Sequence, residues 1–409
     1  MNISFFIASR LFNSKENKNS YTKPIIRIAI LAISLSISLM MISIIVLNGF
    51  KKEIYSKVVG FSSHIKVLNF SDNQSFENDP IDFNQKNYND FIINPNISNV
   101  QIVATKAGII KSKDEILGVV LKGVSTDYDF SFLKENLVSG KVLSLKDDII
   151  DALNEIVISR SIAKSLGVSV GDEISMYFMQ NPVRVRKFTI SGIYNTGLVE
   201  FDDVLIFGDI KHVQKLNNWS EKQIGSYEIS LHDFASLDSE TQKIYDSLDF
   251  NLNATNIKES YPQIFDWLAL QDLNVLVIII LMLIVGSVNM ITALLIIILE
   301  KTQFIGLLKS LGANNKIIRN IFLYNSLYLV SRGLFFGNII ALGFAFLQKN
   351  FSLFKLNEEI YFMSKVPISI DLLPLLYLNI GTFVICYLFL IIPSYVITKI
   401  SPIKALRFE

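Results

Sequence analysis

Side chains able to carry out chemistry are few and scattered in this sequence. The three histidines, His64, His212 and His232, lie far apart. The single cysteine, Cys386, lies inside an apolar run, so no disulfide can form within the chain. The tripeptide SGK at 139–141 lacks the upstream glycine of a phosphate-binding loop, and no nucleophile elbow or zinc-binding HExxH motif occurs. We therefore expect no metal site, no bound cofactor and no enzymatic activity in this chain.

The composition points to a membrane protein. Of the 409 residues, 51% are hydrophobic and only 18% are charged, and the mean hydropathy is +0.41. The net charge of +1 argues against a nucleic-acid-binding protein, which is usually distinctly basic.

Four apolar runs are long enough to cross a bilayer as helices, which takes about 20 residues. They are residues 25–47, 273–299, 321–347 and 372–397. The first run is too long for the apolar region of a signal peptide and has no cleavage site after it, so we interpret it as a membrane anchor. Acidic residues, from which ion relays are built, are almost absent from the four runs.

Basic residues predict the orientation of these spans, because loops on the cytoplasmic side are enriched in Lys and Arg. They flank the spans in three groups: Arg10, Lys15, Lys18, Lys23 and Arg27; Lys301, Lys309, Lys316 and Arg319; Lys399, Lys404 and Arg407. Both termini are therefore expected in the cytoplasm. The predicted order along the chain is an interfacial helix (1–24), the first span (25–49), an extracytoplasmic domain (50–270), the second span (271–299), a cytoplasmic helix (300–316), the third span (317–347), a short outer loop (348–371), the fourth span (372–397) and a tail (398–409).

The large insert is predicted to be a mixed α/β domain. Its β-rich runs are 64–70, 100–110, 116–124, 186–194, 202–207 and 227–231. Residues 159–167 form a short helix, capped by Ser159 and ended by Gly167. The polar segment 71–90 is expected to be a loop.

Helical spacing continues beyond the membrane at both ends of the insert. The residues that keep it are Phe50, Ile54, Lys57, Val58 and Phe61 after the first span, and Ile264, Phe265, Leu268 and Asp272 before the second. These segments are either rigid stalks or ordinary helix ends.

The segment EKTQFIGLLKSLGANNK, residues 300–316, predicts a short amphipathic helix between the second and third spans. Phe304, Leu307, Leu308 and Leu311 share one helical face. Gly312 is placed to end the helix, and the residue two positions later, Asn314, can cap the next one. The helix either lies in the headgroup region or contacts a partner protein.

Five segments together resemble the permeases of the FtsX/MacB superfamily of ABC transporters, and within it the lipoprotein-releasing LolC/LolE type. They are FIASRLF (6–12), NGFKKEIYSKVVGFSSHIKV (48–67), ISRSIAKSLGVSVGDEI (158–174), EKTQFIGLLKSLGANNKIIRNIF (300–322) and SPIKALRFE (401–409). The resemblance extends over nearly the whole length of the chain.

The resemblance implies a bacterial inner-membrane permease that releases lipoproteins with ATP and Mg bound and hydrolysed by a separate cytoplasmic ATPase. It also implies a second permease protomer, whether identical or a sibling, and a lipoprotein substrate. It implies that the ATPase contact or its hinge is formed by Glu300, Phe304, Ile305, Gly306, Leu308, Lys309 and Leu311. Family members that recruit a soluble lipoprotein chaperone carry an extended outer hairpin, whereas residues 176–192 here turn quickly at 180–182, which puts direct chaperone capture in doubt.

Further residues within the spans are candidates for a lipid or packing role. Arg332 is expected near mid-bilayer, where a charged side chain is unfavourable in free energy unless it contacts a polar group. We therefore expect either a polar contact beside the substrate cavity or a contact with Asn289 or Ser287 of the second span. Gly333, Gly337 and Gly343 would permit close helix packing. We expect the substrate's acyl chains to meet Ile42, Ile45, Val46, Phe50, Leu273, Leu276 and Ile280.

Two other functions of related permeases are open to the sequence alone. A MacB-like exporter of peptides or small molecules usually carries its ATPase in the same chain, and this chain has none. An FtsX-like permease that signals to cell-wall hydrolases in division has a smaller outer domain. A plain membrane scaffold would not need the helix at 300–316.

Overall fold

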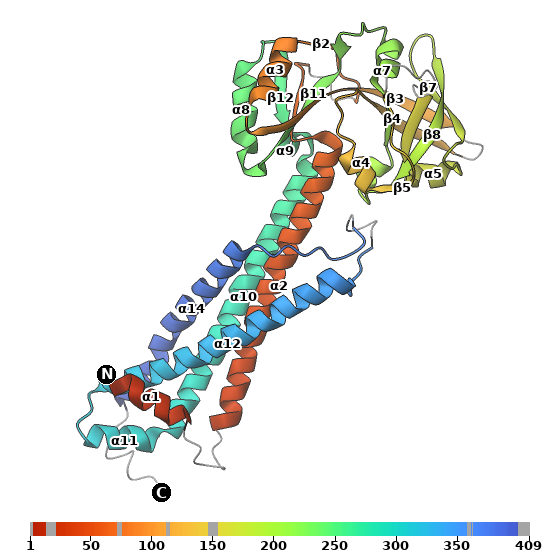
Figure 1. Cartoon of the computed structure of the whole chain (residues 1–409). Helices are drawn as coiled ribbons and strands as arrows, with labels where there is room; N and C mark the ends of the chain where they lie inside the picture. The colour runs from red at the N-terminus through yellow and green to blue at the C-terminus, as the bar shows by residue number, and fades with distance from the viewer. Residues whose placement is uncertain are drawn as a thin grey trace. The chain divides into compact units, whose positions relative to one another are not determined.

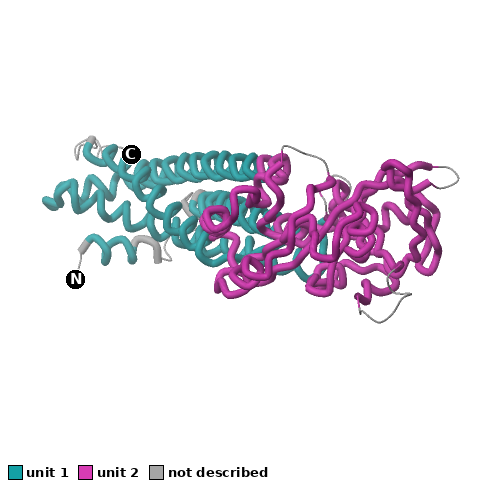
Figure 2. The backbone as a smooth tube through the Cα atoms, turned by 90° about the horizontal axis from the view of Figure 1, so that it is seen from above, with its two compact units in different colours: residues 1–52, 267–354, 366–409 teal, residues 53–266, 355–365 magenta. Residues whose placement is uncertain are grey.

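The computed structural model divides the chain into two compact units, which are coloured separately in Figure 2. The helical unit comprises residues 1–52, 267–354 and 366–409, and the α/β unit comprises residues 53–266 and 355–365. The structure describes residues 3–13, 22–71, 76–111, 115–145, 154–357, 361 and 363–399. The C-terminal segment 401–409 and the basic residues Lys15, Lys18, Lys404 and Arg407 lie outside the described residues.

Seven helices of the described chain lie wholly or largely in the helical unit (Figure 1). They are α1 (Ile3–Asn13), α2 (Thr22–Ser62), α10 (Pro262–Glu300), α11 (Thr302–Ser310), α12 (Asn315–Phe351), α14 (Leu372–Ser394) and α15 (Val396–Lys399). In the described residues, four helical stretches are long and apolar enough to cross a membrane: Ile26–Ser62, Pro262–Glu300, Asn315–Phe351 and Leu372–Thr398. These four candidate membrane helices agree in number and order with the four predicted spans.

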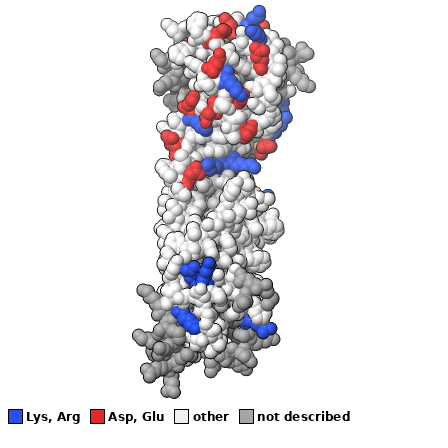
Figure 3. Space-filling view, turned by 90° about the vertical axis from the view of Figure 1, so that its left-hand side faces the viewer, with Lys and Arg blue, Asp and Glu red and all other residues white. Residues whose placement is uncertain are grey.

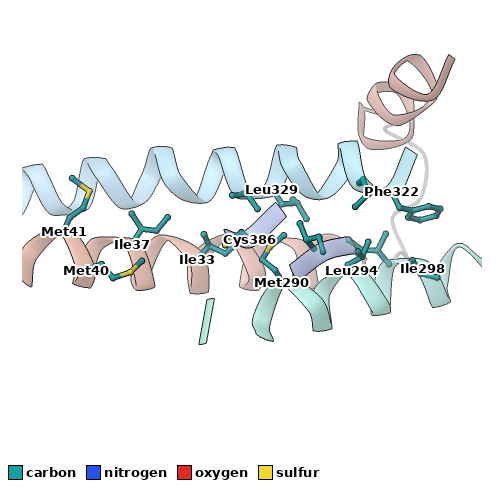
Figure 4. Packing of buried hydrophobic residues seen from close by; sticks show 14 of the residues in the cluster. Ile33, Ile37, Met40, Met41, Met290, Leu294, Ile298, Phe322, Leu329 and Cys386 are labelled. Carbon is teal, nitrogen blue, oxygen red and sulfur yellow. The ribbon is translucent and has the colours of Figure 1, made fainter. Parts of the chain in front are cut away.

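Apolar side chains from these four helices form the core of the helical unit (Figure 4). Ile33, Ile37 and Met40 come from α2, Met290 and Leu294 from α10, and Phe322, Leu329 and Cys386 from α12 and α14. Each is almost fully buried, so the four helices pack as one bundle. The single cysteine, Cys386, is buried in this core, where its thiol packs as a small apolar group.

A ten-stranded sheet is the framework of the α/β unit, with strand order β12-β1-β11-β3-β4-β9-β6-β8-β5, while β7 pairs with β3 and β8. The strands are β1 (Ile65–Asn69), β3 (Ile97–Lys111), β4 (Ile116–Val124), β5 (Leu137–Gly140), β6 (Glu155–Ser159), β7 (Glu173–Phe178), β8 (Arg184–Tyr194), β9 (Leu205–Asp209), β11 (Ser226–Leu231) and β12 (Leu252–Asn256). A separate pair joins β2 (Ile81–Asp82) to β10 (Gln223–Ile224).

Short helices connect these strands: α3 (Gln85–Ile93), α4 (Ser131–Glu135), α5 (Arg160–Leu166), α6 (Val199–Asp202), α7 (Ile210–Asn217), α8 (Leu237–Ser247) and α9 (Ile257–Ser260). The predicted helix at 159–167 is confirmed as α5. The Ser159 hydroxyl accepts a hydrogen bond from the Ile162 N–H, and Gly167 ends the helix in the left-handed conformation. The mixed α/β class is confirmed.

The predicted loop at 71–90 is wrong for its second half. Strand β2 and the start of α3 lie there instead. Asn84 caps α3 by accepting hydrogen bonds from the N–H groups of Lys86 and Asn87, and the buried side chain of Phe91 lies on the face of α3 that packs on the sheet. The segment is polar because most of the surface of α3 faces water, and this polarity made it resemble a loop. The run 202–207 was also placed too early, since Asp202 ends α6 and β9 starts at Leu205.

The helical spacing predicted beyond the spans is confirmed, because α2 continues to Ser62 and α10 begins at Pro262. Within the helical unit, Lys51 of α2 forms an ion pair of 2.8 Å with Asp272 of α10. Within the α/β unit, the ring of Tyr55 in α2 stacks on that of Phe265 in α10, with centroids 5.5 Å apart. The two helices therefore contact each other in both units.

A buried ion cluster lies where α2 ends in the α/β unit. The Lys122 ammonium on β4 donates hydrogen bonds of 2.8 and 2.7 Å to the Glu228 carboxylate on β11 and also bonds to the Phe61 carbonyl near the end of α2. Gln101 donates to the same carboxylate at 3.1 Å. Burial lowers the pKa of Lys122 to about 8, and the cluster satisfies its charge inside the sheet. No local sequence pattern indicates this cluster, because its members are far apart along the chain.

The two units also differ in surface charge. On the face shown in Figure 3, the α/β unit carries both basic and acidic side chains. A broad area of the helical unit on the same face carries neither, and Lys or Arg alone is visible on the described residues at its lower end.

Candidate functional site

The predicted amphipathic helix is present as α11, between α10 and α12. It ends in a Schellman turn: the Ala313 N–H donates to the Leu308 carbonyl at 2.9 Å and the Gly312 N–H to the Lys309 carbonyl at 3.1 Å. Gly312 supplies the positive φ of 85° that this turn requires. Asn314 caps α12 by accepting from the Lys316 N–H, as the sequence predicts.

The apolar residues of α11 are divided between two sides of the helix. Ile305 is 0% exposed and belongs to the bundle core, with Leu308 packed against that core. Leu307 and Leu311 are 49% and 75% exposed. At 100° per residue the four predicted residues do share one face, but its edge at Leu308 turns toward the bundle beside Ile305, while Leu307 and Leu311 are exposed. Periodicity shows that a helix is amphipathic but cannot show which side its neighbours cover.

Three predicted coupling residues take different positions around this helix. Phe304 is half-buried, next to the exposed pair in helical position. Gly306 is buried beside Ile305, so a partner protein cannot reach it directly in this structure. Glu300 is the last residue of α10, with its carboxylate 4.0 Å from the Lys301 ammonium.

Lys309 is directed into the helical unit rather than outward. Its ammonium donates hydrogen bonds to the carbonyls of Ile397, at 3.0 Å, and Thr398, at 3.4 Å, in α15. Partial burial lowers the pKa of Lys309 from its usual value. The ammonium of Lys309 therefore has partners within the chain, and its predicted place in the ATPase contact or its hinge stays a prediction.

The predicted interfacial helix at the N-terminus is α1, which packs on α12. The Ser4 hydroxyl donates to the Ile317 carbonyl at 3.4 Å. The ring of Phe5 meets that of Tyr324 edge-on, with centroids 5.8 Å apart. Helix α1 is thus fixed to the start of α12, immediately after the turn that follows α11.

The seven residues expected around the acyl chains do not form one lining. Ile45 lies in the bundle core and cannot face a ligand, and Ile42 packs against the same core. Val46 and Phe50 are half-buried, and the Phe50 ring contacts that of Trp267 at 5.3 Å. The α10 members are different: Leu273, Leu276 and Ile280 are all about half exposed and lie along one open side of α10.

Arg332 is exposed on α12, and its guanidinium lies over the ring of Tyr328, 4.5 Å from the centroid. In the described part of the chain it makes no hydrogen bond to Asn289 or Ser287, and Asn289 is half-buried elsewhere on α10. The structure thus does not show the expected contact with the second span, and a polar contact beside the substrate cavity stays a prediction.

Two of the three candidate packing glycines lie where α12 packs closely on α2 of the same chain, with no room for a larger side chain. A Cβ at Gly333 would lie 2.5 Å from the Ile33 side chain, and a Cβ at Gly337 would lie 2.9 Å from that of Ile37. Gly343 has nothing within 4 Å of an added Cβ, so it does not pack against another helix of this chain, and packing between two protomers stays a prediction.

Sequence reasoning missed a second contact at the end of the fourth span. The Arg319 guanidinium of α12 lies 4.8 Å from the centre of the Tyr395 ring, which stands between α14 and α15. No local pattern could have found this pair, because the two residues belong to different helices.

Comparison with known proteins places these features in a family. Residues 28–244 match the MacB-like periplasmic core domain, and residues 276–402 match the FtsX-like permease C-terminal region. The chain is similar to the lipoprotein-releasing system transmembrane protein LolC of Buchnera aphidicola subsp. Schizaphis graminum, with 26% identity over 95% of both chains. It is similar to the LolC protein of Neisseria meningitidis serogroup B, with 21% identity over 99% of both chains.

A solved structure also aligns with part of the chain. The periplasmic region of MacB from Actinobacillus actinomycetemcomitans matches 49% of this chain and 91% of that chain, with 15% identity and a TM-score of 0.35. The sequence matches carry the assignment, since the core-domain match alone covers more than half of the 409 residues. The chain therefore belongs to the FtsX/MacB superfamily of permeases, in which a MacB-like periplasmic core domain is followed by an FtsX-like permease region.

Proposed function

We propose that this chain is the transmembrane permease subunit of an ABC transporter that releases lipoproteins from the bacterial inner membrane. The observation that carries the proposal is the similarity to LolC proteins over nearly the full length of both chains. ATP is hydrolysed by a separate cytoplasmic subunit, and the permease passes the resulting movement across the membrane.

In this proposal both termini and α11 are cytoplasmic, and the α/β domain inserted between the first and second spans is periplasmic. The basic residues Lys301, Lys309, Lys316 and Arg319 around α11 support this orientation. The lower end of the helical unit in Figure 3, where Lys and Arg alone are visible on the described residues, is consistent with it.

The ATPase binds the open side of α11. Leu307 of α11 and Leu311, which caps the helix at its C-terminal end, are apolar and exposed, and an amphipathic helix that binds in a partner's groove uses side chains of this kind. Ile305 and Gly306 connect α11 to the bundle from the opposite side, and so pass its movement on.

The acyl chains of the lipoprotein bind along the open side of α10, at Leu273, Leu276 and Ile280. These side chains are apolar and about half exposed, as a surface that receives lipid must be. A second permease protomer completes the site from the other side. Direct capture of a periplasmic chaperone by the β7–β8 hairpin is not part of the proposal, because the two strands are joined by the short turn 179–183.

Depletion of the chain in its native cell, followed by separation of inner and outer membranes, tests the function. We expect lipoproteins to accumulate in the inner membrane, and re-expression of the wild-type chain to restore their sorting. Filamentation with normal sorting would contradict the proposal in favour of an FtsX-like role. Sensitivity to toxic compounds with normal sorting would contradict it in favour of a MacB-like exporter.

A further inference from the structure

Lys309 is on the side of α11 that faces the end of the fourth span. Its ammonium bonds to the Ile397 and Thr398 carbonyls at 3.0 and 3.4 Å. A charged donor makes hydrogen bonds that are stronger than those between neutral groups. Lys309 therefore fixes α11 to α15 through its two hydrogen bonds.

A second contact holds the same place from α12. The Arg319 guanidinium covers the Tyr395 ring at 4.8 Å, and Tyr395 is the residue that joins α14 to α15. Pro393 lies inside α14 just before this joint, and proline removes a backbone hydrogen bond from a helix. The helix is therefore interrupted between α14 and α15, and the side chains of Lys309 and Arg319 contact this region from α11 and α12.

The segment between Lys309 and Arg319 is itself well fixed. The Schellman turn at Gly312 closes α11, and Asn314 caps α12 at once. Ala313 packs against the bundle core, as Leu308 does. A displacement of α11 therefore cannot be absorbed by a loose connection before it reaches Arg319.

We propose that Lys309 and Arg319 connect α11 to the end of the fourth span, so that movement of α11 is transmitted to α14. Lys309 is a positioning residue and makes no contact with the ATPase. This inference rests on the proposed function for the origin of the movement, while the connection itself is a property of the chain alone.

The connection is tested first on the purified full-length chain, without any ATPase. Hydrogen exchange is measured for the amides of residues 395–398 in the wild type and in Lys309→Met, Lys309→Arg and Lys316→Met. Loss of hydrogen bonds from a charged donor should speed exchange about tenfold in Lys309→Met. Lys309→Arg keeps charge and donors and should stay close to wild type. Lys316→Met, an exposed lysine seven residues further on in the first turn of α12, is the matched control and should not change exchange.

The same variants are then compared in the assembled transporter. We expect Lys309→Met to co-purify as much ATPase as wild type while releasing lipoprotein at least about fivefold more slowly. Unchanged exchange at 395–398 in Lys309→Met would overturn the connection. Loss of ATPase from Lys309→Met, to the extent caused by Leu307→Glu, would overturn the positioning role and make Lys309 a contact. If the wild type itself retains no ATPase, the proposed function fails, and the exchange experiment still decides whether the connection exists.

Discussion

The ammonium of Lys122 lies 2.7 Å from the carboxylate of Glu228, and both side chains are almost fully buried in the α/β unit. Removing one member of a buried pair leaves the other charge unpaired, which typically costs about 3–5 kcal/mol. We expect Lys122→Met to lower the unfolding temperature of the purified chain by roughly 5–10 °C. Scanning fluorimetry measures this.

The exposed pair Lys258–Asp238, at 2.9 Å, is the control for that variant. Surface pairs contribute about 0–1 kcal/mol, so Lys258→Met should leave the unfolding temperature nearly unchanged. Equal effects of the two variants would show that the Lys122–Glu228 pair does not hold the sheet together.

His64 makes the stability of the α/β unit depend on pH. It accepts a hydrogen bond from the Leu231 N–H at its Nδ1, and burial lowers the pKa of His64 from 6.5 to about 4. The unfolded chain therefore binds a proton between pH 6.5 and 4 that the folded chain does not. Stability is fully present above pH 6.5 and falls as the pH drops to 4, by about 2 kcal/mol. Unfolding temperatures at pH 6.5 and 4.5 measure the change.

His64→Asn keeps an acceptor but cannot titrate, so the drop in unfolding temperature between these two pH values should become smaller. His232→Asn replaces an exposed histidine and should leave the drop as in wild type. A pH dependence that His64→Asn does not alter would contradict the assignment.

Gly333 sets the approach of α12 to α2. A Cβ at this position would lie 2.5 Å from the Ile33 side chain, which is a steric clash. We expect Gly333→Ala to lower the unfolding temperature, because overpacking costs roughly 1–3 kcal/mol. Ile33→Ala in the same chain should restore part of the loss.

Gly343→Ala tests whether the effect is due to packing rather than to helix propensity. Nothing lies within 4 Å of an added Cβ at Gly343, and alanine favours a helix over glycine. This variant should be neutral or stabilising. If it is as harmful as Gly333→Ala, close packing against Ile33 is not the cause.

The features that could be predicted are those that a single segment of the sequence specifies by itself. The four spans follow from runs of apolar residues, and α5 follows from Ser159 and Gly167 at its two ends. The end of α11 at Gly312 and the cap at Asn314 were predictable for the same reason. Each of these signals is local, so no knowledge of the fold is required.

The features that the sequence could not predict depend on which surfaces meet. Apolar spacing in α11 did not reveal that Ile305 faces the bundle and Leu311 faces outward. Ile45 and Leu273 have similar side chains in similar helices, yet one is core and the other exposed. The Lys309 and Arg319 contacts join segments about 80 residues apart, and only the packed structure brings them together.

The central claim is that a separate ATPase acts on this chain through the open side of α11. Leu308 is unsuitable for the test because it packs against the core, so the charge is placed at Leu307 and Leu311. Ser310→Glu, an exposed neighbour on the same helix, is the matched control.

The most direct measurement is the amount of ATPase that co-purifies with the tagged permease. The account predicts full recovery with wild type and Ser310→Glu, and at least about a tenfold loss with Leu307→Glu plus Leu311→Glu, as expected for charges placed in an apolar contact. Undiminished ATPase with the double variant, or ATP hydrolysis by the purified permease alone, would contradict it.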